Sequence, residues 1–259
     1  MPTPLFFGEE PRRLFGVYHA PSNGQVREQA VVLCPAGPQE YMLTHWAQRR
    51  LAALLAGHGV HVLRFDYFGV GDSQGSIEEG TLDQWQKDIL SASEELRRLS
   101  GVRRTSLVGY RLGATLAWRA SLAATDKPRH LVLWDPVVRG KTYLGELRVT
   151  EDTYASQLLF YPPPDDPPSE LYGYPLPRAQ YDATVAVDLL EEPLPAATRV
   201  HMYVGRQTGE TRALASRLQE NLKRFTHELV PEEGRTGSGN LLSKRVLDAI
   251  GGALSAEGG

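Results

Sequence analysis

Arginine occupies the place of a nucleophile in the segment Gly109-Tyr110-Arg111-Leu112-Gly113. This segment joins an apolar, strand-like run, Thr105–Val108, to a helix-like run, Leu112–Ala124. Two glycines around a central residue at such a junction form the G-x-S-x-G turn, which presents a serine nucleophile at the edge of a sheet. A guanidinium stays protonated and cannot attack a carbonyl carbon. The segment therefore predicts a nucleophile turn that has kept its backbone frame and lost its nucleophile.

The elements that must position this turn follow from alternating apolar patterns. Short apolar runs indicate strands, and longer runs with apolar residues three and four apart indicate helices. The expected strands are Leu5–Phe7, Leu14–His19, Ala30–Cys34, His61–Phe65, Thr105–Val108, His130–Trp134, Arg199–Val204 and His227–Val230. The expected helices cover Trp46–Gly57, Leu82–Leu99, Leu112–Ala124, Thr211–Arg224 and Leu241–Leu254. Such alternation predicts an α/β fold, with a mainly parallel sheet and helices on both faces.

One long segment, Val138–Thr198, interrupts the alternation and differs in composition. It contains Pro162-Pro163-Pro164 and five tyrosines. A segment of this length between a strand and the next unit is typical of an inserted cap or lid. We therefore expect a single domain over residues 1–259, with a small cap insertion at about 138–198.

Three further segments carry a family resemblance. Asp66-Tyr67-Phe68-Gly69-Val70-Gly71-Asp72-Ser73 resembles the D-x-x-G-x-G-x-S turn after the fourth strand of α/β-hydrolases. Pro35–Glu40 and Leu133–Val137 are similar to the bacterial serine-aminopeptidase-like hydrolases, including those associated with exosortase gene clusters. With the order of elements, the resemblance covers nearly the whole chain. It implies the α/β-hydrolase fold and a catalytic triad that is degenerate here.

The other two members of a Ser-His-Asp triad are also missing from their expected places. The resemblance puts the acid after the seventh strand, where this chain has Thr208, and the histidine after the last strand, where it has Arg235 or Thr236. Asp135 is the candidate for a displaced acid. His45 is the one histidine whose position, after the third strand, faces the expected site. The losses predict a protein without Ser-His-Asp hydrolase activity.

Two other nucleophiles keep a hydrolytic alternative open. Gly71-Asp72-Ser73-Gln74-Gly75 matches G-x-S-x-G, but it does not join a strand directly to a helix. Ser73 is therefore interpreted as a loop or capping serine. Cys34 lies at a strand end, and the favoured interpretation is a small buried apolar residue. If either one were the nucleophile, the chain would be an active esterase or thioesterase.

Arg111 itself has two interpretations. It is either a structural arginine, paired with Asp135 first or Glu40 second, or a receptor for an anion. In the second case, Leu112 N–H and a backbone N–H near Gly37 would add donors next to the start of a helix. In both cases the turn predicts a positive φ at Arg111. The candidate ligand-binding residues are Arg111, Leu112, Gly37, Asp135 and His45.

Composition limits the partners. The net charge is -3 over 259 residues, which gives no reason to expect nucleic acid or a membrane as a partner. One cysteine and no recognisable signal peptide indicate a cytoplasmic protein. We see no metal-ligand spacing and no nucleotide motif, so no metal and no cofactor are expected. The leading function is binding of a small acidic ligand or a protein partner through the former active-site cleft. The alternatives are a hydrolase with a relocated nucleophile and a structural or scaffolding subunit.

Overall fold

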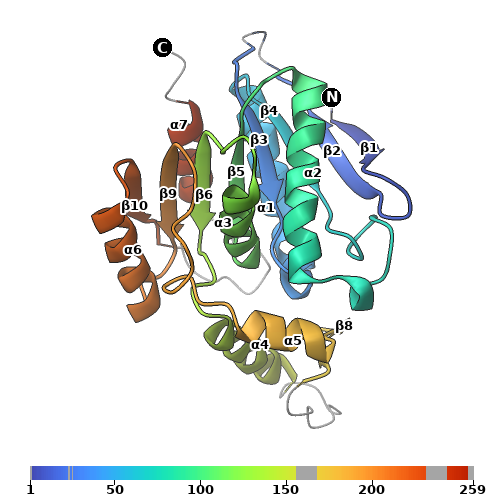
Figure 1. The fold of residues 1–259 in the computed structure, drawn as a ribbon, viewed down its shortest axis with the longest axis vertical. Helices are drawn as coiled ribbons and strands as arrows, with labels where there is room; N and C mark the ends of the chain where they lie inside the picture. Colours follow the sequence, from blue (N-terminus) through green and yellow to red (C-terminus); the bar gives the residue numbers. More distant parts are fainter. Residues whose placement is uncertain (1, 23, 25, 156–167, 232–243, 256–259) are drawn as a thin grey trace.

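The computed structural model describes residues 2–22, 24, 26–155, 168–231 and 244–255. Eight strands form one sheet in the order β1-β2-β4-β3-β5-β6-β9-β10 (Figure 1). The pairs β1–β2 and β2–β4 are antiparallel, and all later pairs are parallel. The bounds are β1 Thr3–Phe7, β2 Leu14–His19, β3 Ala30–Cys34, β4 His61–Phe65, β5 Thr105–Tyr110, β6 His130–Trp134, β9 Arg199–Val204 and β10 Phe225–Leu229. The predicted α/β fold with a mainly parallel sheet is confirmed.

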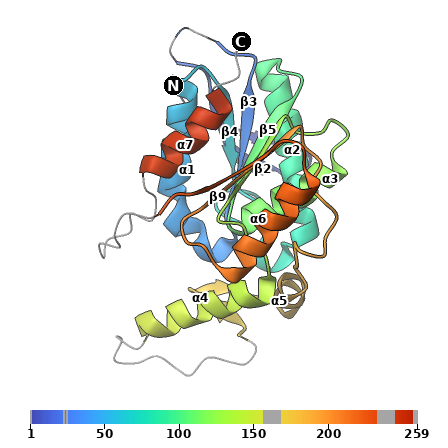
Figure 2. The same ribbon diagram turned by 90° about the vertical axis from the view of Figure 1, so that its left-hand side faces the viewer.

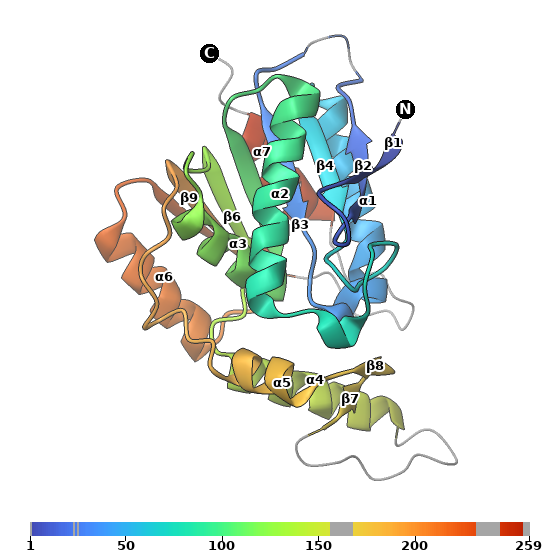
Figure 3. The same ribbon diagram turned by 45° about the vertical axis from the view of Figure 1, so that its right-hand side comes forward.

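Helices cover both faces of the sheet, as predicted. Figures 2 and 3 show α1 and α7 on one face, and α2 and α3 on the other. Each face has its own apolar cluster, one around Leu51 and Ile250 and one around Trp85 and Trp118. The helices are α1 Tyr41–Gly57, α2 Leu82–Ser100, α3 Leu112–Ala123, α4 Gly140–Ala155, α5 Arg178–Val185, α6 Gly209–Asn221 and α7 Lys244–Ser255. Two short 3-10 turns are η1 Pro38–Glu40 and η2 Ile77–Glu79.

The insertion between β6 and β9 contains α4, α5 and a small hairpin. The hairpin pairs β7, Glu170–Leu171, with β8, Tyr174–Pro175. These elements lie beyond the end of the sheet from which the parallel strands point outward (Figure 1). Gln180 on α5 fixes the insertion to the body, because its amide donates to the carbonyls of Ile77 and Gly80 at 2.5 and 2.6 Å. The run Pro162-Pro163-Pro164 lies outside the described residues.

Element boundaries differ from the sequence predictions in a few places. β5 continues two residues further than predicted, to Tyr110, and so reaches Arg111 without a gap. α6 begins at Gly209 rather than Thr211, because the Thr208 side chain caps it. The predicted start of the last helix, at Leu241, falls outside the described residues. Over the part of the chain that the structure describes, none of the helices has the length and apolar character needed to cross a bilayer.

Candidate functional site

The turn between β5 and α3 has the backbone of a nucleophile elbow. Arg111 has φ 52° and ψ -122°, so the predicted positive φ is confirmed. A Cβ on Gly113 would lie 2.0 Å from the carbonyl oxygen of Pro35, and a Cβ on Gly109 would lie 2.4 Å from the Cα of Ala114. Real Cβ atoms do not approach other atoms so closely. The two glycines are therefore required by packing, and they permit the tight turn in which Arg111 has its positive φ.

Two carboxylates hold the Arg111 side chain. Its Nε donates to Glu40 Oε1 at 3.0 Å, and its Nη2 donates to Glu146 Oε2 at 3.1 Å. The guanidinium also lies over the Tyr143 ring, 5.1 Å from the ring centroid. Glu40 ends η1, while Tyr143 and Glu146 are three residues apart on α4 of the insertion. Arg111 therefore joins the core of the molecule to the cap.

Asp135, the first predicted partner of Arg111, does not form this pair, and that prediction was wrong. Its Oδ1 accepts a hydrogen bond from Gly205 N–H at 2.7 Å. Its own N–H donates to the carbonyl of Tyr203 at 2.8 Å. Asp135 has a positive φ of 41° directly after β6, and it connects the ends of β6 and β9. Glu40, the second predicted partner, is confirmed.

The positive charge of Arg111 is compensated by the acidic groups around it. Burial alone would lower the pKa of Arg111, but Glu40 and the other nearby acidic groups outweigh burial and raise it. Burial, followed by the Glu40 carboxylate, raises the pKa of Tyr143 well above its ordinary value. The Tyr143 hydroxyl therefore stays protonated and donates to Glu40 Oε2 at 2.9 Å. The exposed Arg206 lies 3.8 Å from the other oxygen of Glu146. Arg111 is thus a neutralised cation at the centre of a structural network.

The structure brings three of the five predicted ligand-binding residues together. Arg111, Leu112 and Gly37 lie together, since a Cβ on Gly37 would be 3.1 Å from Leu112 Cδ2 and 3.3 Å from the Tyr143 hydroxyl. Asp135 points to Gly205, as described above. The His45 ring packs against Tyr41, with 5.9 Å between centroids. The segment that contains Gly37 thus packs against the start of α3. A ligand-binding role for the five residues stays a prediction.

The two alternative nucleophiles are occupied in structural roles. Ser73 Oγ donates to the Asp66 carbonyl at 2.7 Å and accepts from Phe15 N–H at 2.9 Å, which confirms it as a loop serine. Cys34 is buried, and burial raises the pKa of its thiol. Because the thiolate is the reactive form, this cysteine is suppressed as a nucleophile.

The position expected for the triad acid also has a structural role. Thr208 Oγ1 accepts from Thr211 N–H at 3.1 Å and caps the start of α6. Arg235, at the position expected for the triad histidine, lies outside the described residues. Among the described side chains, no group of three His, Cys, Asp or Glu residues is arranged to hold a metal ion.

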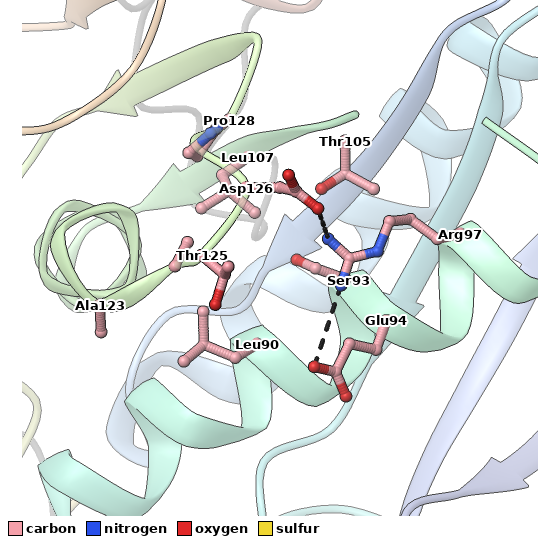
Figure 4. Close-up of a pocket in the computed structure, with 11 residues that line it drawn as sticks. Leu90, Ser93, Glu94, Arg97, Thr105, Leu107, Ala123, Thr125, Asp126 and Pro128 are labelled. Carbon is pink, nitrogen blue, oxygen red and sulfur yellow. Dashed lines mark ion pairs between the residues drawn. The ribbon is translucent and has the colours of Figure 1, made fainter. Parts of the chain in front are cut away.

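A cavity of about 80 Å³ lies beside the start of β5, whereas Arg111 follows the end of this strand. It is lined by the end of α2, the start of β5 and the loop after α3 (Figure 4). Its central charge, Arg97, is already paired with Asp126 at 3.6 Å and with Glu94 at 3.9 Å. Because its lining includes none of the residues around Arg111, this cavity is separate from the elbow site.

A family model described as "alpha/beta hydrolase fold" matches residues 29–229. The chain belongs to this family. Bovine palmitoyl-protein thioesterase ABHD10, a mitochondrial protein, is 41% identical over 70 residues, which are 27% of this chain and 22% of the relative. The match thus spans about a fifth of the curated relative. The human protein of the same name is 43% identical over 65 residues, 25% of this chain and 20% of its own length.

Solved structures show the same fold over almost the whole chain. An esterase from Pyrococcus furiosus superposes with a TM-score of 0.69 at 15% identity, covering 100% of this chain and 91% of its own. Mouse alpha/beta hydrolase domain-containing protein 10 superposes with a TM-score of 0.59 at 18% identity, covering 98% of this chain and 97% of its own. At these identities the likeness shows the fold alone.

Proposed function

We propose that this α/β-hydrolase family member is a pseudoenzyme that binds a small acidic ligand or a protein partner beside Arg111, without Ser-His-Asp hydrolysis. One observation carries the proposal. The residue at the nucleophile position is a cation, and both of its ends are held by carboxylates, Glu40 and Glu146. An acidic group from outside the chain could engage the Arg111 guanidinium by competing with one of these two carboxylates.

The two carboxylates are not equivalent, and this difference gives the binding mode. Glu40 is 12% exposed and is also held by the Tyr143 hydroxyl. Glu146 is 40% exposed and lies on the cap. A carboxylate from a ligand or from a partner's acidic side chain would therefore replace Glu146 and leave Glu40 in place. Arg111 would exchange one carboxylate for another, and α4 would be released from the elbow.

Calorimetry with acetate and succinate tests this exchange. Glu146→Gln should bind these anions roughly fivefold more tightly than the unaltered protein, because the internal competitor is gone. Arg111→Ala should abolish binding. Asp152→Asn, which removes an exposed carboxylate from the same helix, is the matched control and should change little. If Glu146→Gln shows no binding, the acidic-ligand function is wrong, and the scaffolding alternative gains.

An acyl-thioester hydrolase is the second candidate, favoured by the local identity to the ABHD10 thioesterases. The contacts of Ser73 and the burial of Cys34 oppose it. A fluorophosphonate probe and a palmitoyl thioester substrate separate the two candidates. Labelling or turnover that disappears in Ser73→Ala or Cys34→Ala would establish the hydrolase and overturn the binding protein.

A cytoplasmic location belongs to the same proposal and rests on the single buried cysteine. The ABHD10 relatives are named as mitochondrial proteins, so the alternative location is the mitochondrion. Fractionation of cells that express the tagged chain distinguishes the two compartments.

A further inference from the structure

A second group of basic side chains lies where α1 packs on the antiparallel end of the sheet. α1 contacts both β4 and β2 (Figure 3). In the β2–β4 pairing, His19 is opposite Val62 and Val17 is opposite Arg64. Since paired residues share a face and alternate residues along a strand share a face, His19 and Arg64 lie on one side of the sheet. Val62 belongs to the apolar cluster under α1, so this is the side that α1 covers.

Neither arginine in this group forms an ion pair with a carboxylate of the described residues. Arg64 Nε approaches His19 Nε2 at 3.4 Å, which is a weak contact for a guanidinium. Arg49, on α1, lies over the Trp46 ring at 5.2 Å from the centroid. Other arginines of the chain are paired, for example Arg139 with Asp188 at 3.1 Å. The donors of Arg64 and Arg49 are thus available to an acceptor that is not part of the chain.

Burial and the two arginines both act on the pKa values of the neighbouring histidines. Burial, then Arg64, then Arg49 lower the pKa of His19 to about 4. Burial, then Arg64, also lower the pKa of His45, although Asp66 and Asp72 act in the opposite direction. Asp66, a carboxylate that acts on both His45 and Arg64, already accepts from the Tyr41 hydroxyl at 3.2 Å and from Asp72 N–H at 3.1 Å.

We propose that Arg49 and Arg64, with the partly buried His45 and the buried His19 beside them, form a binding site for the oxyanion group of a small organic ligand. A phosphate or carboxylate fits, because guanidinium groups recognise both through paired N–H donors. Trp46 is 65% exposed beside Arg49, and its ring offers a surface for the organic part of the ligand. Met42, one turn earlier on α1, extends this apolar surface. His45 is also one of the ligand-binding residues predicted with Arg111, but His19, Arg49 and Arg64 are not, so variants of the two arginines test this site independently of the proposed function.

Titrations with inorganic phosphate, sodium sulfate and sodium acetate at fixed ionic strength test the site. Binding is followed by nuclear magnetic resonance of the histidine side chains, and the His19 and His45 signals should move saturably with the preferred anion. Phosphate and sulfate acting more strongly than acetate would assign a phosphate-type ligand, and the reverse order a carboxylate. If no anion gives saturable shifts, the site does not exist.

Variants separate a built site from general charge screening. Arg49→Gln and Arg64→Gln should each weaken the binding of the preferred anion roughly tenfold. Arg50→Gln is the matched control, because it removes the same charge from the next, exposed position of α1. It should leave the affinity within a factor of about two. Equal weakening by Arg50→Gln would overturn the proposal. Arg49 is exposed, so its variant tests the site even if Arg64→Gln fails to fold.

Discussion

Arg111 and Arg64 are both partly buried arginines, and their surroundings differ in one respect. Arg111 is held between Glu40 and Glu146 and lies over Tyr143. Among the described residues, Arg64 contacts His19 at 3.4 Å and forms no ion pair with a carboxylate. The pKa of Arg111 is raised by its acidic neighbours, whereas burial lowers the pKa of Arg64. The position that the family resemblance marked as functional is thus internally neutralised, and the position without a motif retains the available charge.

The largest expected effect comes from removing the turn that presents Arg111. Gly113→Val would place side-chain atoms against the Pro35 carbonyl, where even a Cβ would be at 2.0 Å. We expect a loss of about 3 kcal/mol or more in the free energy of unfolding, since backbone atoms cannot yield as a side chain can. Urea unfolding measures it. Gly145→Val, at a glycine with no atom within 4 Å of a Cβ, is the control and should be much milder.

The comparison of the two arginines is sharpest when each is changed to methionine. Arg111→Met leaves Glu40 buried without its cation, and we expect a cost of about 2–4 kcal/mol in unfolding free energy. Arg64→Met removes a partly buried charge that forms no ion pair with a carboxylate of the described residues, so stability should stay equal or rise. The double variant Arg111→Met, Glu40→Gln should recover part of the loss. Equal destabilisation by the two single changes would remove the distinction between a neutralised and an available arginine.

Local sequence predicts much of the fold. Of the side chains that contact Arg111, it predicts Glu40 but not Glu146 or Tyr143. The runs Ala30–Cys34 and His61–Phe65 were predicted to the residue, because the first is apolar throughout and the second carries three apolar residues in a short run. Glu40, at the end of the segment that follows β3, was also predicted, as the second candidate partner of Arg111. Glu146 and Tyr143 were missed, because only tertiary packing decides where a cap helix lies. Their three-residue spacing on one helical face was the single available signal.

Asp135 shows a different limit of sequence reasoning. Its place after β6, next to the elbow strand, made it the first predicted partner of Arg111. The positive φ of 41° turns its side chain toward Gly205 instead. No residue pattern indicates a left-handed conformation at an aspartate that is followed by proline.

A smaller effect is expected from pH, through His19 in the Arg64 group. Its pKa is about 4 in the folded chain, against an ordinary value near 6.5. Between these values the unfolded chain binds more protons than the folded chain, so the free energy of unfolding falls as the pH drops. The loss between pH 6.5 and 4 should be at most about 3 kcal/mol. His19→Asn should flatten this slope in urea unfolding across that range, and an unchanged slope would contradict the assignment.

The smallest expected effect is on catalysis, where we predict no change at all. Arg111→Ser restores a hydroxyl to the elbow, and its φ of 52° would present that hydroxyl in the position of a nucleophile. The acid position holds Thr208, which caps α6, and Asp135 is bound to Gly205. The members of a triad act as a unit, so a serine without a base gains little. Hydrolysis of p-nitrophenyl acetate by the variant should equal that of the unaltered chain. Turnover that appears with the serine would mean that a base survives near the elbow, and the neutralised Arg111 would then be a lock on an otherwise competent site.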